Sequence, residues 1–117
     1  MANFPPVGAP TIEKWERLAD KYPVERGPEF ADGGRDTFCA STTPIRTWVT
    51  IARGMTVAEA AIFDAWHAGV LGEHLPYTLT DRDGATYGGV KCVGYERGHE
   101  GFYEYGQFRK ITHEDRP

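Results

Sequence analysis

Residues 80–89, TDRDGATYGG, contain the acidic pattern in this sequence that comes closest to a metal site. Asp81 and Asp83 stand one residue apart and precede Gly84, as oxygen ligands do at the start of an EF-hand calcium loop. Such a loop also needs an oxygen ligand at its fifth position, a glycine at its sixth and a glutamate at its twelfth. Counted from Asp81, these positions hold Ala85, Thr86 and Cys92. Because the flanking segments PYTLT and TYGGVKC are typical of strands, we predict a β-hairpin turn here rather than a calcium site.

Zinc binding and hydrolytic catalysis find less support in the residue spacing. His67 and His74 are seven residues apart and no CxxC or HxxxH pair exists, whereas zinc ligands usually come in closely spaced pairs. Cys39 or Ser41 could serve as a nucleophile on paper, but neither sits in a nucleophile elbow or a glycine-rich oxyanion loop. We therefore predict that the chain is not an enzyme and has no catalytic, metal-binding or cofactor-binding residues.

The bulk composition is that of an ordinary globular chain of one domain. The 117 residues carry a formal net charge of -4 and no run of Lys or Arg, which argues against a nucleic-acid binder. No apolar run approaches the roughly 18 residues that a membrane span needs, and the first ten residues lack the pattern of a signal peptide. Cys39 and Cys92 are expected to be buried thiols of a protein that folds in a cytosol. A disulfide between them stays open as an alternative, because both lie in strand-like segments.

Residues 1–23 are predicted to form an arm and a short helix that contact another subunit. The first ten residues contain three prolines and one glycine, which is typical of an extended arm. At about residues 12–21 apolar side chains recur at steps of three and four, as on one face of an amphipathic helix. These apolar residues are Ile12, Trp15, Leu18 and Tyr22. Thr11 is placed to cap the helix and Pro23 to end it.

Residues 24–117 are predicted to form a single β-rich domain. A turn-rich segment at 24–34 opens it, and the glycine-containing loop 96–101 is expected at the surface. Alternating apolar and polar residues, bounded by turn signals, mark the strands. The predicted strands are residues 35–43, 45–53, 76–80, 86–95 and 105–114.

One central helix is predicted at about residues 56–69. Thr56 and Glu59 match the capping box, in which the threonine hydroxyl and the glutamate carboxylate each accept a backbone N–H of the first turn. An alanine-rich run follows, and Gly69 or Gly72 is placed to end the helix. The expected fold class is mainly β (α+β), an antiparallel β-sandwich or barrel-like domain carrying this helix.

The order of these elements resembles that of a known family. A strand with Trp48 leads to the helix of Thr56 and Glu59, then to Gly72 and to a hairpin with an acidic-glycine turn. This succession resembles the small minor tail and distal tail proteins of long-tailed bacteriophages, the group that includes minor tail protein M of lambda-like phages. The likeness covers about residues 30–115, and the N-terminal portion is extra. The matching positions are Trp48, Thr56, Glu59, Phe63, Trp66, Gly72, Gly84 and Tyr87.

The resemblance implies a structural role in a virion. Members of this family form a ring that joins the tail tube to the distal tip or baseplate, commonly as a homohexamer, with a trimer as an alternative. The implied partners are further copies of this chain, the tail tube protein, a hub or tip protein and, as a further candidate, the tape-measure protein. The implied location is the phage tail, assembled in the host bacterial cytoplasm. The family has no catalytic residues to carry over, so the matching positions are fold determinants.

Surplus aromatic and apolar residues are the candidates for the assembly interface. The candidate interface residues are Trp15, Leu18, Tyr22, Phe30, Tyr103 and Tyr105. An alternative function is a small β-sandwich module that binds carbohydrate or another ligand. It would use Trp48, or the aromatic residues between Tyr95 and Phe108, as a stacking surface.

Overall fold

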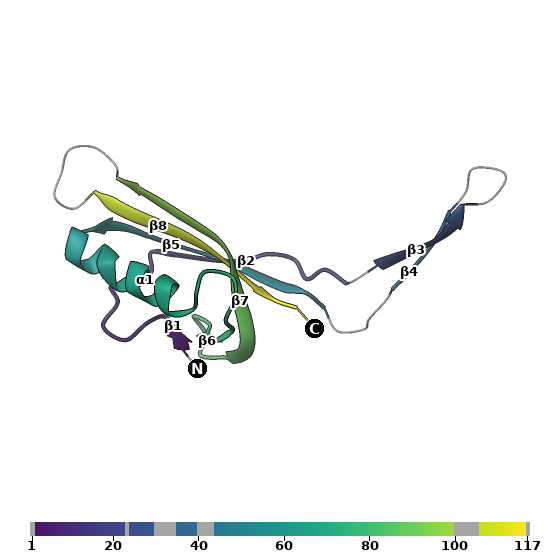
Figure 1. The fold of residues 1–117 in the computed structure, drawn as a ribbon, viewed down its shortest axis with the longest axis horizontal. Coiled ribbons are helices and arrows are strands. Elements are labelled where there is room, and N and C mark those ends of the chain that lie inside the picture. The colour runs from purple at the N-terminus through teal and green to yellow at the C-terminus, as the bar shows by residue number, and fades with distance from the viewer. Residues whose placement is uncertain (1, 23, 30–34, 40–43, 100–105, 117) are drawn as a thin grey trace.

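The computed structural model describes residues 2–22, 24–29, 35–39, 44–99 and 106–116. This part of the chain is mainly β, as predicted, but it contains one helix where two were expected (Figure 1). Six strands form one curled, mixed sheet in the order β1-β6-β7-β8-β5-β2, and β3 and β4 form a separate two-stranded sheet. The elements are β1 (Ala2–Phe4), β2 (Lys14–Arg17), β3 (Val24–Glu29), β4 (Arg35–Cys39), β5 (Arg46–Met55), α1 (Val57–Gly69), β6 (Tyr77–Thr80), β7 (Thr86–His99) and β8 (Gln107–Asp115).

The predicted central helix is confirmed, together with its capping box. The Thr56 hydroxyl accepts the Glu59 N–H at 3.2 Å, and the Glu59 carboxylate accepts the Thr56 N–H at 3.1 Å. The helix ends at Gly69, and Gly72 follows in the left-handed region at φ 67°, donating its N–H to the His67 carbonyl at 3.1 Å. The buried face of α1 packs against β5 and β8. The buried residues of this face are Ala60, Phe63 and Trp66.

The predicted N-terminal helix at about residues 12–21 is wrong, because this segment contains the strand β2. Lys14–Arg17 pairs antiparallel with β5, with Arg17 opposite Trp48, and the Leu18 N–H continues the ladder to the Thr47 carbonyl at 3.0 Å. A helix of ten residues has little stability of its own in water. The long strand β5 instead offers a row of backbone partners, so tertiary pairing overrides the helical spacing of the apolar residues.

The first residues are part of the folded body rather than an arm, so the arm prediction is wrong for β1. Ala2–Phe4 pairs parallel with β6, with Phe4 opposite Leu79. The Phe4 side chain is fully buried, and its ring lies 4.8 Å from Trp66 and 4.3 Å from His113, centroid to centroid. The strand β1 ends at Phe4, and the next residue, Pro5, has no N–H to extend the ladder.

The other strand predictions hold in outline, with errors at the boundaries. Strands β4, β5, β6, β7 and β8 lie where strands were expected. The segment 24–34 was expected to be turns, but its first part is β3, and a register shift between Arg26 and Glu29 falls where Pro28 interrupts the ladder. The predicted surface loop 96–101 is wrong for residues 96–99, because β7 continues to His99. The glycine-rich turn between β3 and β4 lies outside the described residues.

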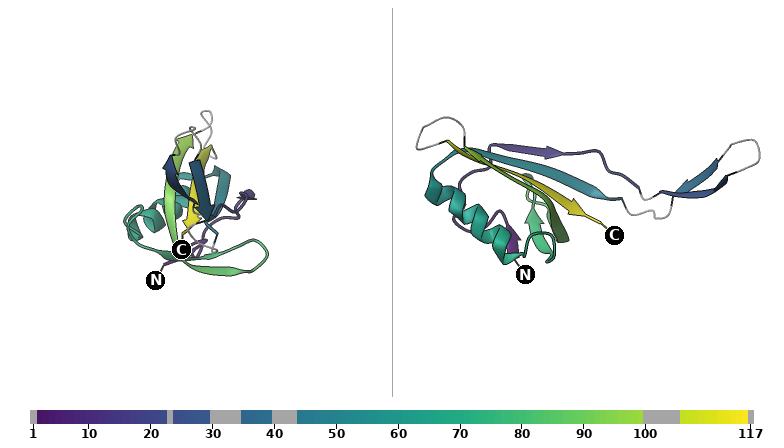
Figure 2. Two further views of the ribbon diagram at one scale, coloured as in Figure 1. Left: turned by 90° about the vertical axis from the view of Figure 1, so that its right-hand side faces the viewer. Right: turned by 45° about the horizontal axis from the view of Figure 1, so that its top comes forward.

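The expected antiparallel β-sandwich is not confirmed. The sheet is mixed, since β1 runs parallel to β6, and the long strand β7 connects the two halves of one curled sheet (Figure 2). Gly89 sits in the left-handed region at φ 76° within β7, and a bulge follows between Cys92 and Gly94. The core lies inside the curl and beneath α1. Its largest fully buried apolar side chains are Trp48, Tyr77, Phe4, Phe63, Met55, Leu79 and Ile111.

Candidate assembly surface

Three of the six predicted interface residues lie along one edge of the curled sheet. Trp15, on β2, is half-buried with its ring 6.1 Å from that of Phe4, so it belongs in part to the core. Leu18 and Tyr22 follow β2 and are 39% and 51% exposed. Phe30, Tyr103 and Tyr105 lie outside the described residues. The structure therefore places two exposed apolar side chains next to an edge strand.

The strand β2 is an open edge of the sheet. One side of it pairs with β5, and no strand of the described residues pairs with the other. The pairing continues past the strand to an isolated bridge between Lys21 and Ile45. An unpaired row of N–H and C=O groups is a template for a strand from another chain. Lys14 and Glu16 lie 3.9 Å apart and are exposed, so this ion pair contributes little to stability.

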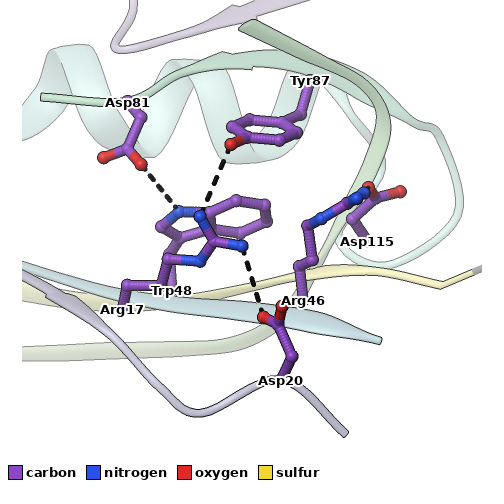
Figure 3. A network of polar contacts seen from close by, with 7 residues as sticks. All are labelled: Arg17, Asp20, Arg46, Trp48, Asp81, Tyr87 and Asp115. Atoms are coloured by element: carbon purple, nitrogen blue, oxygen red, sulfur yellow. Dashed lines mark hydrogen bonds and ion pairs between the residues drawn. The ribbon is translucent and has the colours of Figure 1, made fainter. Parts of the chain in front are cut away.

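A polar network ties this edge to the start of β7 (Figure 3). The guanidinium of Arg17 lies 5.6 Å from the Trp48 ring centroid and 5.9 Å from that of Tyr87, within cation–π range. It also donates to Asp20 at 3.3 Å. Arg46 lies 5.5 Å from the Tyr87 ring and pairs with an aspartate of β8 at 3.1 Å. The Tyr87 ring thus contacts two cations, one from the edge strand β2 and one from β5.

The acidic turn at residues 81–84 is a hairpin turn, as predicted, and it has a second role. The Gly84 N–H donates to the Asp81 carbonyl at 2.9 Å, and the Asp83 carboxylate accepts the Ala85 N–H at 3.2 Å. Asp81 accepts the Arg82 N–H with one carboxylate oxygen, at 2.7 Å, and the indole N–H of Trp48 with the other, at 3.2 Å. Both acids therefore stabilise the turn. Among the described residues, no group of three or more His, Cys, Asp or Glu side chains could hold a metal ion.

A second polar cluster, formed by Thr50, Tyr77 and His113, is buried, and sequence reasoning missed it. His113 is 0% exposed; its Nδ1 lies 2.5 Å from the Tyr77 hydroxyl and its Nε2 lies 2.9 Å from the Thr50 hydroxyl. Because Thr50 donates onward to the Ile111 carbonyl at 3.4 Å, the consistent arrangement has Tyr77 donating to Nδ1 and Nε2–H donating to Thr50. Burial lowers the pKa of His113 to about 3 and raises that of Tyr77. No sequence motif marks this set, because its members come from three separate strands.

These groups satisfy one another rather than forming a reactive site. No atom of His113 is exposed to accept a proton from a substrate. Its neutral imidazole is hydrogen-bonded to Thr50 and Tyr77. Cys92 is a buried free thiol, and burial raises its pKa to about 11, which makes it a poor nucleophile near neutral pH. Because Cys92 is free, the alternative disulfide between Cys39 and Cys92 is wrong for this structure. The Cys39 side chain itself lies outside the described part of the chain.

Comparison with known proteins leaves the family of this chain unassigned. In the described residues, no helix combines the length and the apolar character that crossing a bilayer requires. No protein-family model matches the chain, and no curated protein matches it.

Proposed function

We propose that this chain is a structural protein of a bacteriophage tail, which assembles into a ring joining the tail tube to the distal tip or baseplate. The observation that supports this proposal best is the hairpin of β3 and β4. These two strands pair with each other, from Val24 opposite Cys39 to Glu29 opposite Arg35, and with no strand of the six-stranded sheet. The hairpin projects away from the body that holds the core (Figures 1 and 2).

The dimensions of the molecule also indicate that the hairpin of β3 and β4 projects from the body. The radius of gyration is 17.9 Å and the principal extents are 62 × 31 × 26 Å. A compact domain of this length would have a radius of gyration of about 13 Å. A lone two-stranded hairpin is marginally stable in water, so a projecting hairpin needs a surface to pack on. In a ring, a neighbouring copy supplies that surface.

The open edge of β2 supports a repeating assembly in the same way. The edge strand β2, which Leu18 and Tyr22 follow, can pair with another chain through its backbone, and that chain can cover these exposed side chains. We count the curled sheet as a barrel-like domain, since Phe4 of β1 and Trp15 of β2, from opposite edges, lie with ring centroids 6.1 Å apart. If the edge of β2 pairs with a different surface of the next copy, the contact is heterologous, and it closes into a ring when the rotation between copies allows it.

The proposed ring is a homohexamer, with a trimer as the alternative. Its neighbours along the tail would be the tail tube protein on one side and a hub or tip protein on the other, with the tape-measure protein as a further candidate. The location proposed is the virion. The alternative carbohydrate-binding function loses one of its two surfaces, because Trp48 is 0% exposed and lies beneath Arg17 and Tyr87 (Figure 3).

Removing the hairpin tests the proposal. Lys21 and Ile45 exchange both of their backbone hydrogen bonds, so residues 22–44 can be replaced by Asn-Gly, which favours a tight two-residue turn between antiparallel strands. The wild-type protein is expected to form rings by native mass spectrometry and electron microscopy. The shortened chain is expected to be monomeric and to stay folded, and near-ultraviolet circular dichroism checks its folding.

A matched control changes the turn between β6 and β7. Asp83→Asn alters an exposed turn of the body and leaves β3 and β4 in place, so it should assemble like the wild type. A wild-type chain that stays monomeric at high concentration, alone and with tail tube protein added, would overturn the proposed function.

A further inference from the structure

A polar pocket of about 410 Å³ lies between α1 and β7, away from the open edge of β2. The helix contributes Asp64, His67 and Ala68, whose spacing of three and four places them on one face. The strand contributes Tyr95 and Arg97, which are two residues apart and so point to the same face of the sheet. Two side chains that can carry positive charge therefore line one pocket.

The acidic group of this pocket is already neutralised. Arg109 of β8, which is 6% exposed, donates to both Asp64 oxygens at 2.9 Å, from Nε to Oδ1 and from Nη2 to Oδ2. The Tyr95 hydroxyl also donates to Asp64 Oδ1. The hydrogen bonds from Arg109 hold the pKa of Asp64 below its usual value, against the opposing effect of burial. Asp64 is thus an ionised, paired group that fixes the positions of Arg109 and Tyr95.

The other cation of the pocket, Arg97, has no hydrogen-bonded acid among the described residues, although its charge also contributes to the lowered pKa of Asp64. Arg97 lies directly opposite Arg109 in the β7–β8 ladder, and like charges in that position repel each other. Asp64 compensates Arg109, whereas Arg97 is exposed and makes no ion pair or hydrogen bond with any described residue. Asp64, Arg109 and Arg97 together therefore carry a charge of +1, on a chain whose net charge is -4.

A flat aromatic pair stands beside this cation. The His67 and Tyr95 rings stack with centroids 4.0 Å apart and planes inclined by 5°. Because Tyr95 is held by Asp64, the stack also holds His67 in place at the pocket wall. A planar anion could accept two parallel hydrogen bonds from the Arg97 guanidinium and a further one from the imidazole. A carboxylate has this geometry.

We propose that the pocket lined by Asp64, His67, Ala68, Tyr95 and Arg97 is a carboxylate-binding site. The carboxylate comes either from a free organic acid or from an Asp or Glu side chain of a neighbouring copy. The second source rests on the proposed ring, but the binding chemistry is the same. The 17 acidic residues of each chain, against 13 basic ones, make a second copy a carrier of suitable groups.

Glutarate is the probe for the site itself. Backbone amide shifts of the isotope-labelled protein are followed during titration with sodium glutarate, with sodium chloride added to keep ionic strength constant. We expect saturable shifts centred on residues 64–68 and 95–97, with a dissociation constant in the millimolar range, and about tenfold weaker binding after Arg97→Gln. Lys91→Gln removes a charge from the same strand outside the pocket and should bind as the wild type does. Absence of saturable shifts, or equal binding by the Arg97→Gln variant, would overturn the proposal.

A second measurement separates the two sources. If a neighbouring copy supplies the carboxylate, Arg97→Gln weakens self-association in sedimentation velocity, Lys91→Gln does not, and glutarate competes with assembly. If rings of wild type and Arg97→Gln are equally stable while glutarate still binds, the site takes a free acid. Because the glutarate titration works on a monomer, failure of the ring proposal leaves this test intact.

Discussion

The indole N–H of Trp48, near the start of β5, donates to Asp81 Oδ2 in the turn between β6 and β7, at 3.2 Å. The two residues are 33 positions apart in the chain. This bond joins the strand that carries the edge β2 to the hairpin on the other side of the curl (Figure 3). Because Trp48 is 0% exposed, its N–H has no access to water as a substitute partner. The acidic turn therefore stabilises the closed form of the sheet as well as the hairpin itself.

Replacing Asp81 by Ala should destabilise the fold. The change leaves the Trp48 N–H buried without an acceptor, which costs about 1–3 kcal/mol of unfolding free energy. Urea unfolding followed by tryptophan fluorescence measures the loss. Asp83→Ala, which removes an exposed turn bond alone, should cost less than half as much, and Asp81→Asn should recover part of the loss, since its amide oxygen can accept. Equal effects of the two alanine changes would contradict the role given to the Trp48 bond.

Phe4→Ala tests whether the N-terminus belongs to the core. Phe4 is fully buried among Trp66, Tyr77 and His113, so truncation should cost about 3–5 kcal/mol. Val7→Ala is the matched change at a side chain that is 95% exposed, and should stay within about 0.5 kcal/mol of the wild type. Thermal unfolding by circular dichroism separates the two. An unchanged melting temperature for Phe4→Ala would mean that β1 is a detachable arm after all.

The capping box of α1 can be tested by a single hydroxyl. Thr56→Ala removes the acceptor of the Glu59 N–H and should lower stability by about 1 kcal/mol, whereas Thr56→Ser keeps the acceptor and should cost only a few tenths. Chemical unfolding midpoints measure both. If the serine variant were as unstable as the alanine variant, the threonine methyl group rather than the cap would carry the effect.

Acid should destabilise the protein through His113. In the folded state its pKa is about 3, while an unfolded histidine titrates near 6.5, so the unfolded chain takes up a proton first as the pH falls. The contribution of neutral His113 is present above pH ~6.5 and is lost between there and about pH 3, at up to ~1.4 kcal/mol per pH unit. Asp64, whose pKa is also lowered, adds a loss of the same sign at more acidic pH.

Urea midpoints between pH 7.5 and 4.5 should therefore fall for the wild type. His113→Gln should be less stable at pH 7.5, because the hydrogen bonds to Tyr77 and Thr50 are disturbed, but should lose less stability on acidification. His74→Gln, at an exposed position, is the control and should keep the wild-type slope. An unchanged slope in the His113→Gln variant would assign the acid sensitivity to other groups.

The sequence by itself determined those elements whose signals lie within a few residues. Thr56 and Glu59 stand three apart and satisfy each other's backbone, so the start of α1 follows from local chemistry. The turn at residues 81–84 likewise closes through its own side chains and Gly84, which takes a φ of 92°. The alternation along β5 and the other predicted strands is equally local.

Tertiary structure decided the features that depend on residues far apart. The spacing of Trp15 and Leu18 suited a helix, but the free backbone of β5 made residues 14–17 a strand. Phe4 follows no periodic pattern and becomes a core residue because the curl of the sheet leaves a place for its ring. The Trp48–Asp81 bond and the His113 cluster join residues that are far apart in the chain. The local sequence does not indicate which distant donor will bond to which acceptor. Local hydrogen bonds thus set the elements, whereas pairing and burial across the curled sheet set their final form.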